Sequence, residues 1–187
     1  MIREMVPEAP LERTEYGLHA AGEGWFVLNA REARWRDRPE RGYSLPFGGA
    51  TDFPQYVVNL YVLGPGEPIG MYHWEADQED FLVVAGEAVL IVEGEERPLR
   101  QWDFVHCPPN AKHTIVGAGN GPCVVVAVGA REHDGKPNWG GYTVDEVAGR
   151  YGASTAVETT EPQEAYAHLT RRLPARYREG WLPDASA

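Results

Sequence analysis

Short runs of apolar and β-branched residues recur between about residues 55 and 130, and Gly or Pro closes each run. Branched side chains pack well on a pleated surface, so runs of this length are typical of β-strands. A regular series of short strands separated by turn residues predicts an all-β sandwich or barrel. The predicted strands cover residues 56–63, 81–85, 88–92, 103–106, 113–116 and 124–128.

The segments on either side of this region have a different texture. Residues 1–50 mix Pro, Gly, Arg and Glu around short apolar pieces, which predicts an arm with one or two strands that packs on a barrel of residues 51–135. Residues 136–187 predict short helices and an extended tail, packed on its own barrel or on a neighbour's. Capping-box patterns at residues 143–146 and 160–163 start two helices, which run toward Gly152 and to about Leu169. We expect one structural domain overall.

The composition argues against several classes of function. A formal net charge of −11 disfavours binding to the phosphate backbone of nucleic acids. No apolar run is long enough to span a membrane, and the start of the chain lacks the pattern of a secretory signal, which predicts a cytoplasmic protein. Cys107 and Cys123 imply no disulfide framework and are interpreted as buried free thiols.

One basic cluster stands out against this acidic background. Its members lie within a short stretch near the N-terminus: Arg31, Arg34, Arg36, Arg38 and Arg41. A solvated face or a dimer contact would explain the cluster. A site for a substrate anion or for a partner is the alternative.

The residues that carry chemistry begin at His73. Side chains two apart in a strand share a face, so His73 and Glu75 point the same way. Three residues then turn the chain, and Glu79 starts the next strand, which brings it back beside that face. His113 follows the stiff Pro-Pro-Asn loop at residues 108–110. Two imidazoles and two carboxylates at a common centre predict a site for one divalent cation, with Fe, Mn, Zn or Ni as candidates.

Strand alternation also predicts the surroundings of this centre. Met71, Phe81 and Ile115 share the ligand face, and Tyr61 lies one strand away, so these four residues are expected to line a mostly apolar substrate pocket. They could equally fill the barrel, as side chains do in small barrels. Without a metal the two inward-facing acids would repel one another, so at least one would take up a proton.

The same residues resemble the two motifs of the cupin superfamily. The first motif, His-x-His, three or four residues, Glu, six residues, Gly, is similar to the segment from His73 to Gly86. The second, Gly, five residues, Pro-x-Gly, two residues, His, is similar to the segment from Trp102 to His113. Glu75 replaces the second His of the first motif, and Trp102 and Asn110 replace two glycines of the second.

The resemblance implies a double-stranded β-helix, a jelly-roll barrel that is usually dimeric and holds a metal at its mouth. It places His73, Glu79 and His113 at ligand positions, and leaves Glu75 as a fourth ligand or as a general base. The chain resembles bacterial single-domain cupins of uncharacterised function.

These observations predict a metal-dependent enzyme that acts on a small oxygen-rich organic molecule, as an isomerase or a dioxygenase. Glu75 or Glu79 would move the proton. The alternative is a cupin without turnover that binds a metal or a small ligand as a sensor or store. In either case we expect a homodimer whose arm and tail bury apolar surface against the second subunit.

Overall fold

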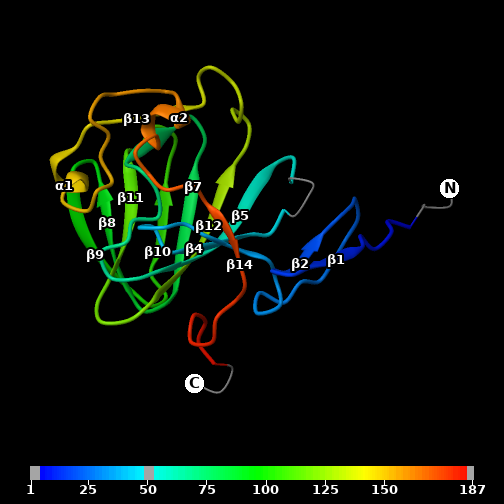
Figure 1. Ribbon diagram of the computed structural model, residues 1–187. Helices are drawn as coiled ribbons and strands as arrows, with labels where there is room; N and C mark the ends of the chain where they lie inside the picture. The colour runs from blue at the N-terminus through cyan, green and yellow to red at the C-terminus, as the bar shows by residue number, and fades with distance from the viewer. Residues whose placement is uncertain (1–4, 49–52, 185–187) are drawn as a thin grey trace.

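The computed structural model describes residues 5–48 and 53–184, and Figure 1 shows two facing β-sheets with a hairpin to one side. All pairings between the named strands are antiparallel. The seven-stranded sheet has the order β10 (Phe104–Cys107), β7 (Glu79–Ala85), β12 (Cys123–Ala130), β5 (Tyr56–Leu63), β4 (Tyr43–Pro46), β3 (Trp35–Asp37) and β14 (Leu173–Ala175). The five-stranded sheet has the order β13 (Gly140–Tyr142), β6 (His73–Glu75), β11 (His113–Ala118), β8 (Glu87–Val92) and β9 (Glu95–Arg100). The predicted all-β double-stranded β-helix is confirmed.

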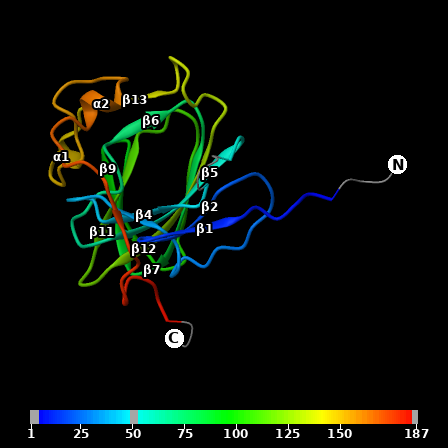
Figure 2. The same cartoon turned by 45° about the vertical axis from the view of Figure 1, so that its right-hand side comes forward.

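The N-terminal arm contains more strands than the sequence suggests. The described residues 5–48 contain four strands in place of the one or two expected. Two of them, β1 (Leu11–Thr14) and β2 (Gly17–Ala20), form a hairpin that extends away from the barrel (Figures 1 and 2). The other two, β3 and β4, extend the large sheet beyond β5. The division of the chain at residues 50 and 135 stays a prediction.

The C-terminal tail packs on its own barrel. Strand β14 pairs with β3, and the ring of Trp181 lies 5.2 Å from that of Trp35 and 3.9 Å from that of Tyr43. These side chains cover the outer face of the large sheet together with Leu45 and Leu60. The tail therefore encloses a second apolar layer outside the barrel.

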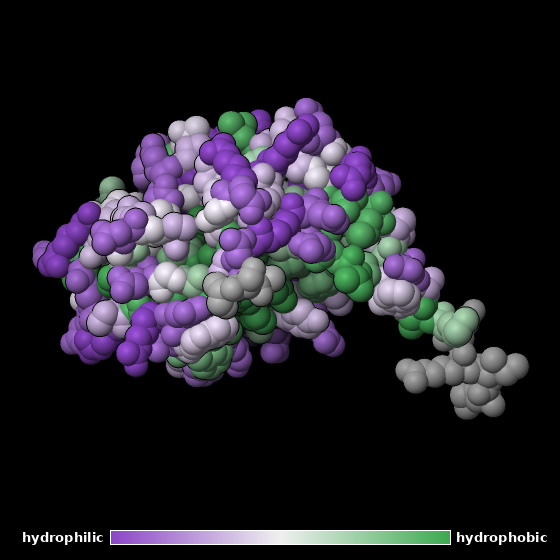
Figure 3. Space-filling model, turned by 90° about the horizontal axis from the view of Figure 1, so that it is seen from below, coloured by the Kyte–Doolittle hydropathy of each residue, from purple (hydrophilic) through white to green (hydrophobic). Residues whose placement is uncertain are grey.

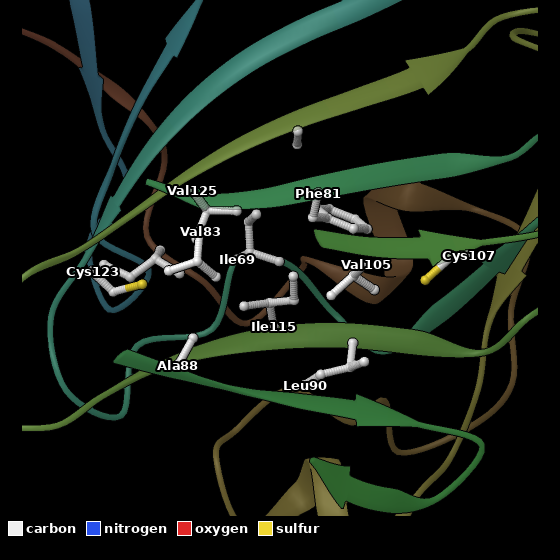
Figure 4. Close-up of a cluster of buried hydrophobic side chains, with 12 residues drawn as sticks. Ile69, Phe81, Val83, Ala88, Leu90, Val105, Cys107, Ile115, Cys123 and Val125 are labelled. Atoms are coloured by element: carbon white, nitrogen blue, oxygen red, sulfur yellow. The ribbon is translucent and has the colours of Figure 1, made fainter. Parts of the chain in front are cut away.

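The main core fills space between the two sheets (Figure 4). Inward-facing side chains from both sheets meet there, among them Phe81, Val83 and Ile115. Cys107 and Cys123 are buried free thiols in this cluster, as predicted.

The turns follow the predicted chemistry, whereas the helix caps do not. Asn110 has the left-handed φ of 70°, and Trp102 takes a φ of 75° where the cupin motif has glycine. Helix α1 (Glu146–Gly149) is capped by Asp145, whose side chain accepts the Ala148 N–H, so the predicted capping box at residues 143–146 is wrong.

The second helix is also shorter than predicted. Helix α2 (Pro162–Ala165) begins after Glu161, which makes no side-chain cap bond, and only turns continue toward Leu169. Its Pro stands at the start of the helix as expected. No helix in the described part of the chain is long and apolar enough to cross a membrane.

Candidate metal centre

Three strands bring the predicted ligands together. In the small sheet, His73 of β6 lies directly opposite His113 of β11, and their rings are 4.9 Å apart. Glu79 opens β7 in the facing sheet and pairs there with Gly129 of β12. A Cβ on Gly129 would lie 3.2 Å from the Glu79 carboxylate, so glycine leaves room for this acid.

The side chains converge on a small volume. Nε2 of His113 lies 3.0 Å from Oε2 of Glu79, and Nε2 of His73 lies 3.5 Å from the same oxygen. One donor atom from each of the three residues lies within 4.8 Å of the other two. The His113 side chain is 2% exposed, and those of His73 and Glu79 are 14% and 15% exposed. These three residues therefore form a group that can hold a metal ion.

Both imidazoles are oriented by the backbone. Nδ1 of His73 lies 2.8 Å from the Met71 carbonyl oxygen, and Nδ1 of His113 lies 3.0 Å from the Ala111 carbonyl oxygen. A carbonyl can only accept, so each Nδ1 carries the proton and each Nε2 faces the centre. Neutral rings would then present two nitrogen lone pairs to a carboxylate oxygen. A proton or a cation must lie between them, and the donor set fits a divalent cation with its outer hydrogen bonds already in place.

The electrostatics of the metal-free group keep Glu79 ionised. Burial alone would raise the pKa of Glu79, but hydrogen bonds from His113 and His73 outweigh burial and lower it to about 2. Burial disfavours charge on His73, yet the hydrogen bonds to Glu75 and Glu79 raise its pKa well above 6.5. Glu79 is therefore not the acid that takes up a proton, because the hydrogen bonds from the two histidines favour its charged form. That at least one of the two acids takes up a proton stays a prediction.

Glu75 stands at the edge of this group. Its Oε1 lies 3.5 Å from Nε2 of His73, but Glu75 does not join the three residues whose donor atoms are mutually close. Its backbone is held by the Pro-Pro-Asn loop, because the Asn110 N–H donates to the Glu75 carbonyl at 2.7 Å. Its side chain lines a cavity.

The cavity has a volume of about 330 Å³ and lies at the end of the barrel opposite the apolar core. Glu75 and Glu79 line it, together with Tyr61. Most of its remaining lining is polar or charged, which contradicts the expectation of a mostly apolar pocket. These polar and charged residues are Arg36, Arg38, Ser44, Asn59, Asp77, Arg131, Asp134 and Arg172.

The comparison with protein families agrees with this architecture. Residues 59–129 match the family described as a cupin domain. The chain carries a cupin domain. The matched residues hold His73, Glu75, Glu79 and His113, and the resemblance seen in the two sequence motifs is confirmed.

Several solved structures are similar to this cupin. A sugar phosphate isomerase from a cupin superfamily, from Silicibacter pomeroyi, is 28% identical, with a TM-score of 0.43 over 55% of this chain and 62% of that chain. A conserved protein with a double-stranded β-helix domain from Klebsiella pneumoniae is 25% identical, with a TM-score of 0.40 over 42% and 65% of the two chains. A Cupin 2 conserved barrel domain protein from Salinispora arenicola is 23% identical, with a TM-score of 0.40 over 46% and 72%.

This chain spans less than two thirds of the length of the first two of these proteins. No curated protein matches it.

Three of the four predicted pocket residues do not line the cavity of this cupin. Phe81 and Ile115 point inward as alternation requires, but each lies two residues deeper than a site residue and belongs to the closed core. Met71 packs in a separate cluster with Tyr142, and Nη2 of Arg41 lies 2.8 Å from its sulfur. For Phe81 and Ile115, alternation thus gave the correct face but not the depth along the barrel.

The arginines in the cavity wall could not be placed there from the sequence. Arg36 and Arg38 line the cavity from β3 and the turn after it, and Arg172 reaches it from the segment before β14. The cluster of arginines at residues 31–41 was visible in the sequence. Its position was not, because it depends on the pairing of β3 with β4 and β14.

Proposed function

We propose that this cupin is a metal-dependent enzyme that acts on a small oxygen-rich organic molecule, of the isomerase or dioxygenase type. The supporting observation is a group of three converging donors, His73, Glu79 and His113, beside a cavity of about 330 Å³ that Glu75 also lines. Catalytic metal sites typically have three protein ligands and keep a position open for substrate or water. A volume of this size suits a small organic molecule.

In this proposal His73, Glu79 and His113 hold one divalent cation, with Fe, Mn, Zn or Ni as candidates. When bound, such an ion supplies Lewis-acid polarisation of a substrate oxygen. Glu79 is engaged by both histidines, at 3.0 and 3.5 Å, so its role is that of a ligand. Glu75 has a single contact of this kind and faces the cavity, so its role is to accept or deliver a proton at the substrate.

Tyr61 is the other polar group placed to assist. Burial raises the pKa of its phenol, although the charge of Arg38 opposes this shift. The hydroxyl therefore keeps its proton at neutral pH and can donate a hydrogen bond to a substrate oxygen. Its position in the cavity lining suits the orientation of a substrate between the two acids and the arginines.

Metal analysis tests the ligand assignment. The protein is purified without a nickel column, stripped with a chelator, and dialysed against Fe(II), Mn(II), Ni(II) or Zn(II) before elemental analysis. We expect about one equivalent of metal in the wild type and strong loss in His113→Ala and Glu79→Ala. The matched controls are His106→Ala and Asp80→Ala, which remove an exposed His–Asp pair (2.6 Å) from the outer side of β7. Full metal content in both ligand variants would show that the ligand assignment is wrong.

Glu75→Gln separates its two candidate roles. As a base, Glu75 can be replaced without loss of metal, whereas turnover of any substrate found for the enzyme falls. As a ligand, it cannot be replaced without weaker metal binding. Loss of metal in Glu75→Gln would therefore overturn the assignment of Glu75 as a base. Full protein ligation of the metal, with no exchangeable water, would favour the sensor or storage role.

We also propose that the protein forms a homodimer through its arm. The arm exposes Val27 (78%) and Trp25 (53%), and apolar surface gathers toward the arm in the view from below (Figure 3). Exposed apolar surface of this kind is typical of interfaces. Light scattering after size exclusion at micromolar concentration should give twice the chain mass of 20.8 kDa, and Trp25→Glu with Val27→Glu should give the monomer. A monomeric wild type would contradict this proposal.

A further inference from the structure

Arg38 is a buried cation in the cavity wall, and one nitrogen of its guanidinium group has no hydrogen-bond partner among the described residues. The residue is 6% exposed, and its Nη2 donates to the Ile69 carbonyl oxygen at 2.7 Å. Its guanidinium carbon lies 5.2 Å from the centre of the Tyr61 ring. Its Nη1, although buried, has no hydrogen-bond partner in the described part of the chain. Such an unmet donor is rare in folded proteins and calls for a partner.

No carboxylate among residues 5–48 and 53–184 forms an ion pair with Arg38. Burial lowers the pKa of this guanidinium, the nearby Tyr61 opposes that shift, and the positive charge of Arg172 adds to it. A buried charge without a counter-charge is costly, and the cost is removed when an anion binds. Glu79 does not serve as that counter-charge, because its carboxylate is already paired with His73 and His113.

Three arginines of the cavity wall come from neighbouring segments of the chain. Arg36, Arg38 and Arg172 line the same cavity as Glu75 and Glu79, but they come from β3 and from the segment before β14, which lie beyond β4 and β5 in the large sheet. Arg38 and Arg172 also line a neighbouring hollow of about 290 Å³. Arg41 and Arg171 line that hollow too, and none of the described residues in its lining is a carboxylate. Arg38 and Arg172 therefore belong to both hollows. The acids that line the first hollow have partners of their own: Glu75 and Glu79 pair with histidines of the metal centre, Asp77 pairs with His133, and Asp134 pairs with Arg131.

We infer that Arg38 and Arg172 bind an anionic oxygen group, a carboxylate or a phosphate ester, on the molecule that occupies this cavity. That the molecule is a substrate rests on the proposed function; the binding of the anion does not. A guanidinium presents its N–H groups in a planar fork that matches both kinds of oxyanion. In this arrangement Nη1 of Arg38 and the exposed Arg172 donate to the anion, Tyr61 lies beside it, and the rest of the molecule reaches toward Glu75 and the metal centre.

The net charge of the protein makes this local arrangement specific. A chain with a formal charge of −11 repels small anions over most of its surface. An anionic molecule would therefore be held best where several arginines line one hollow, as they do here. The choice between the two oxyanions is left to the test, since both satisfy the same donors.

Binding of simple anions to metal-free protein tests the inference separately from any catalysis. Inorganic phosphate and acetate are titrated in turn, and binding is followed by NMR shifts of the arginine side-chain and backbone amide signals. Saturable binding with shifts at Arg38 and Arg172 is expected for at least one anion. Tighter binding of phosphate identifies a phosphate ester as the ligand group, and tighter binding of acetate identifies a carboxylate.

Variants then locate the site. Arg172→Met removes an exposed side chain and should weaken binding of the anion by about tenfold to a hundredfold, the loss expected for a charged hydrogen bond. Arg38→Met should weaken it at least as much, and Arg38→Lys should restore part of the affinity. Arg97→Met, an exposed arginine of β9 in the other sheet, is the matched control and should leave binding unchanged. Should Arg38→Met fail to fold, the anion affinity of Arg172→Met alone decides the test.

Three outcomes keep this inference separate from the proposed function. Equal anion affinity in the wild type, Arg172→Met and Arg97→Met overturns the inference, whatever the metal content. Metal content at the wild-type level in Arg172→Met, combined with lost anion binding, supports an anion site that is distinct from the metal ligands. A protein that binds the anion but no metal would overturn the proposed function and leave the anion site standing.

Discussion

The two ends of the barrel interior are built from the same strands and carry opposite chemistry. On β7, Glu79 faces the cavity while Val83, four residues on along the same face, is 0% exposed in the apolar core (Figure 4). On β11, His113 belongs to the ligand group and Ile115 to the core. Inward orientation is thus common to both ends. What separates a site from a core is the residue type at the inward position nearest the mouth.

The two ends also differ in how they are stabilised. The closed end gains free energy from burial of apolar surface and needs no partner. The open end buries the charges of Glu79 and Arg38, which require a cation or an anion as compensation. The open end should therefore respond to pH and ligands, and the closed end should respond only to changes in packing.

The largest expected effect is a loss of stability that leaves metal binding unchanged. Ile115→Ala leaves a cavity in the closed end and should lower the free energy of unfolding by about 2–5 kcal/mol, since Ile115 is 0% exposed. Urea unfolding of the metal-free protein measures this loss. Metal affinity of the folded variant should remain at the wild-type value. A large loss of metal affinity with little loss of stability would contradict the separation of the two ends.

The next effect is a dependence of metal binding on pH. His73 has a pKa well above 6.5 in the metal-free protein, so it carries a proton near neutral pH. Metal binding needs the Nε2 lone pair, so it releases this proton, and affinity should rise by about tenfold per pH unit for each proton displaced. Calorimetric titration in two buffers with different ionisation enthalpies measures the release. Equal heats in both buffers would mean that His73 is already neutral.

The same group makes the stability of the metal-free protein depend on pH in two directions. The pKa of His73 is raised on folding, so its contribution is complete below pH 6.5 and is lost as pH rises through the raised value. The pKa of Glu79 is lowered to about 2, so its contribution is present above pH 4.5 and is lost as pH falls toward 2. Unfolding at a series of pH values should show both losses, and the Ile115→Ala protein should show them unchanged.

The contrast between the ends also explains how much could be predicted from the sequence. The strand from Tyr56 to Leu63 was predicted to the residue, because local β-branched runs and turn residues define it. The convergence of His73, Glu79 and His113 follows from two-residue alternation and a short turn. The roles of Phe81 and Ile115 were open between pocket and core, because alternation gives a face and depth depends on where the cavity ends.

The arginine end and the helix caps depend on longer-range packing. Arg38 reaches the cavity only because β3 pairs with β4 and β14, and these contacts have no local signal in the sequence. Thr143 matched a capping box, yet its N–H donates to the Tyr72 carbonyl, which holds it in the barrel wall and leaves Asp145 as the cap. Tertiary contacts decided between two locally acceptable caps.

A smaller effect is expected at the boundary between the two ends. The ring of Phe81 lies 5.4 Å from that of His113 at an angle of 64°, so Phe81 belongs to the core and also supports a ligand. Phe81→Leu keeps most of the apolar volume and removes the ring contact, which should cost about 0.5–1.5 kcal/mol of stability. Metal affinity should fall by a smaller factor than in His113→Ala. An unchanged metal affinity would mean that the Phe81 ring does not support His113, so that the metal centre ends at His113 and Phe81 belongs to the core alone.

The smallest effect is expected on the outer side of the same strand. Asp80 is the neighbour of Glu79, but it points away from the barrel interior and pairs with His106, which is 52% exposed. Exposed pairs contribute about 0–1 kcal/mol, because water screens the charges and the side chains lose rotamer freedom. Asp80→Asn should therefore change urea unfolding within that range and leave metal content at the wild-type level. A loss of metal comparable to that of Glu79→Ala would mean that the charge of the strand, and not the inward position of the carboxylate, determines binding.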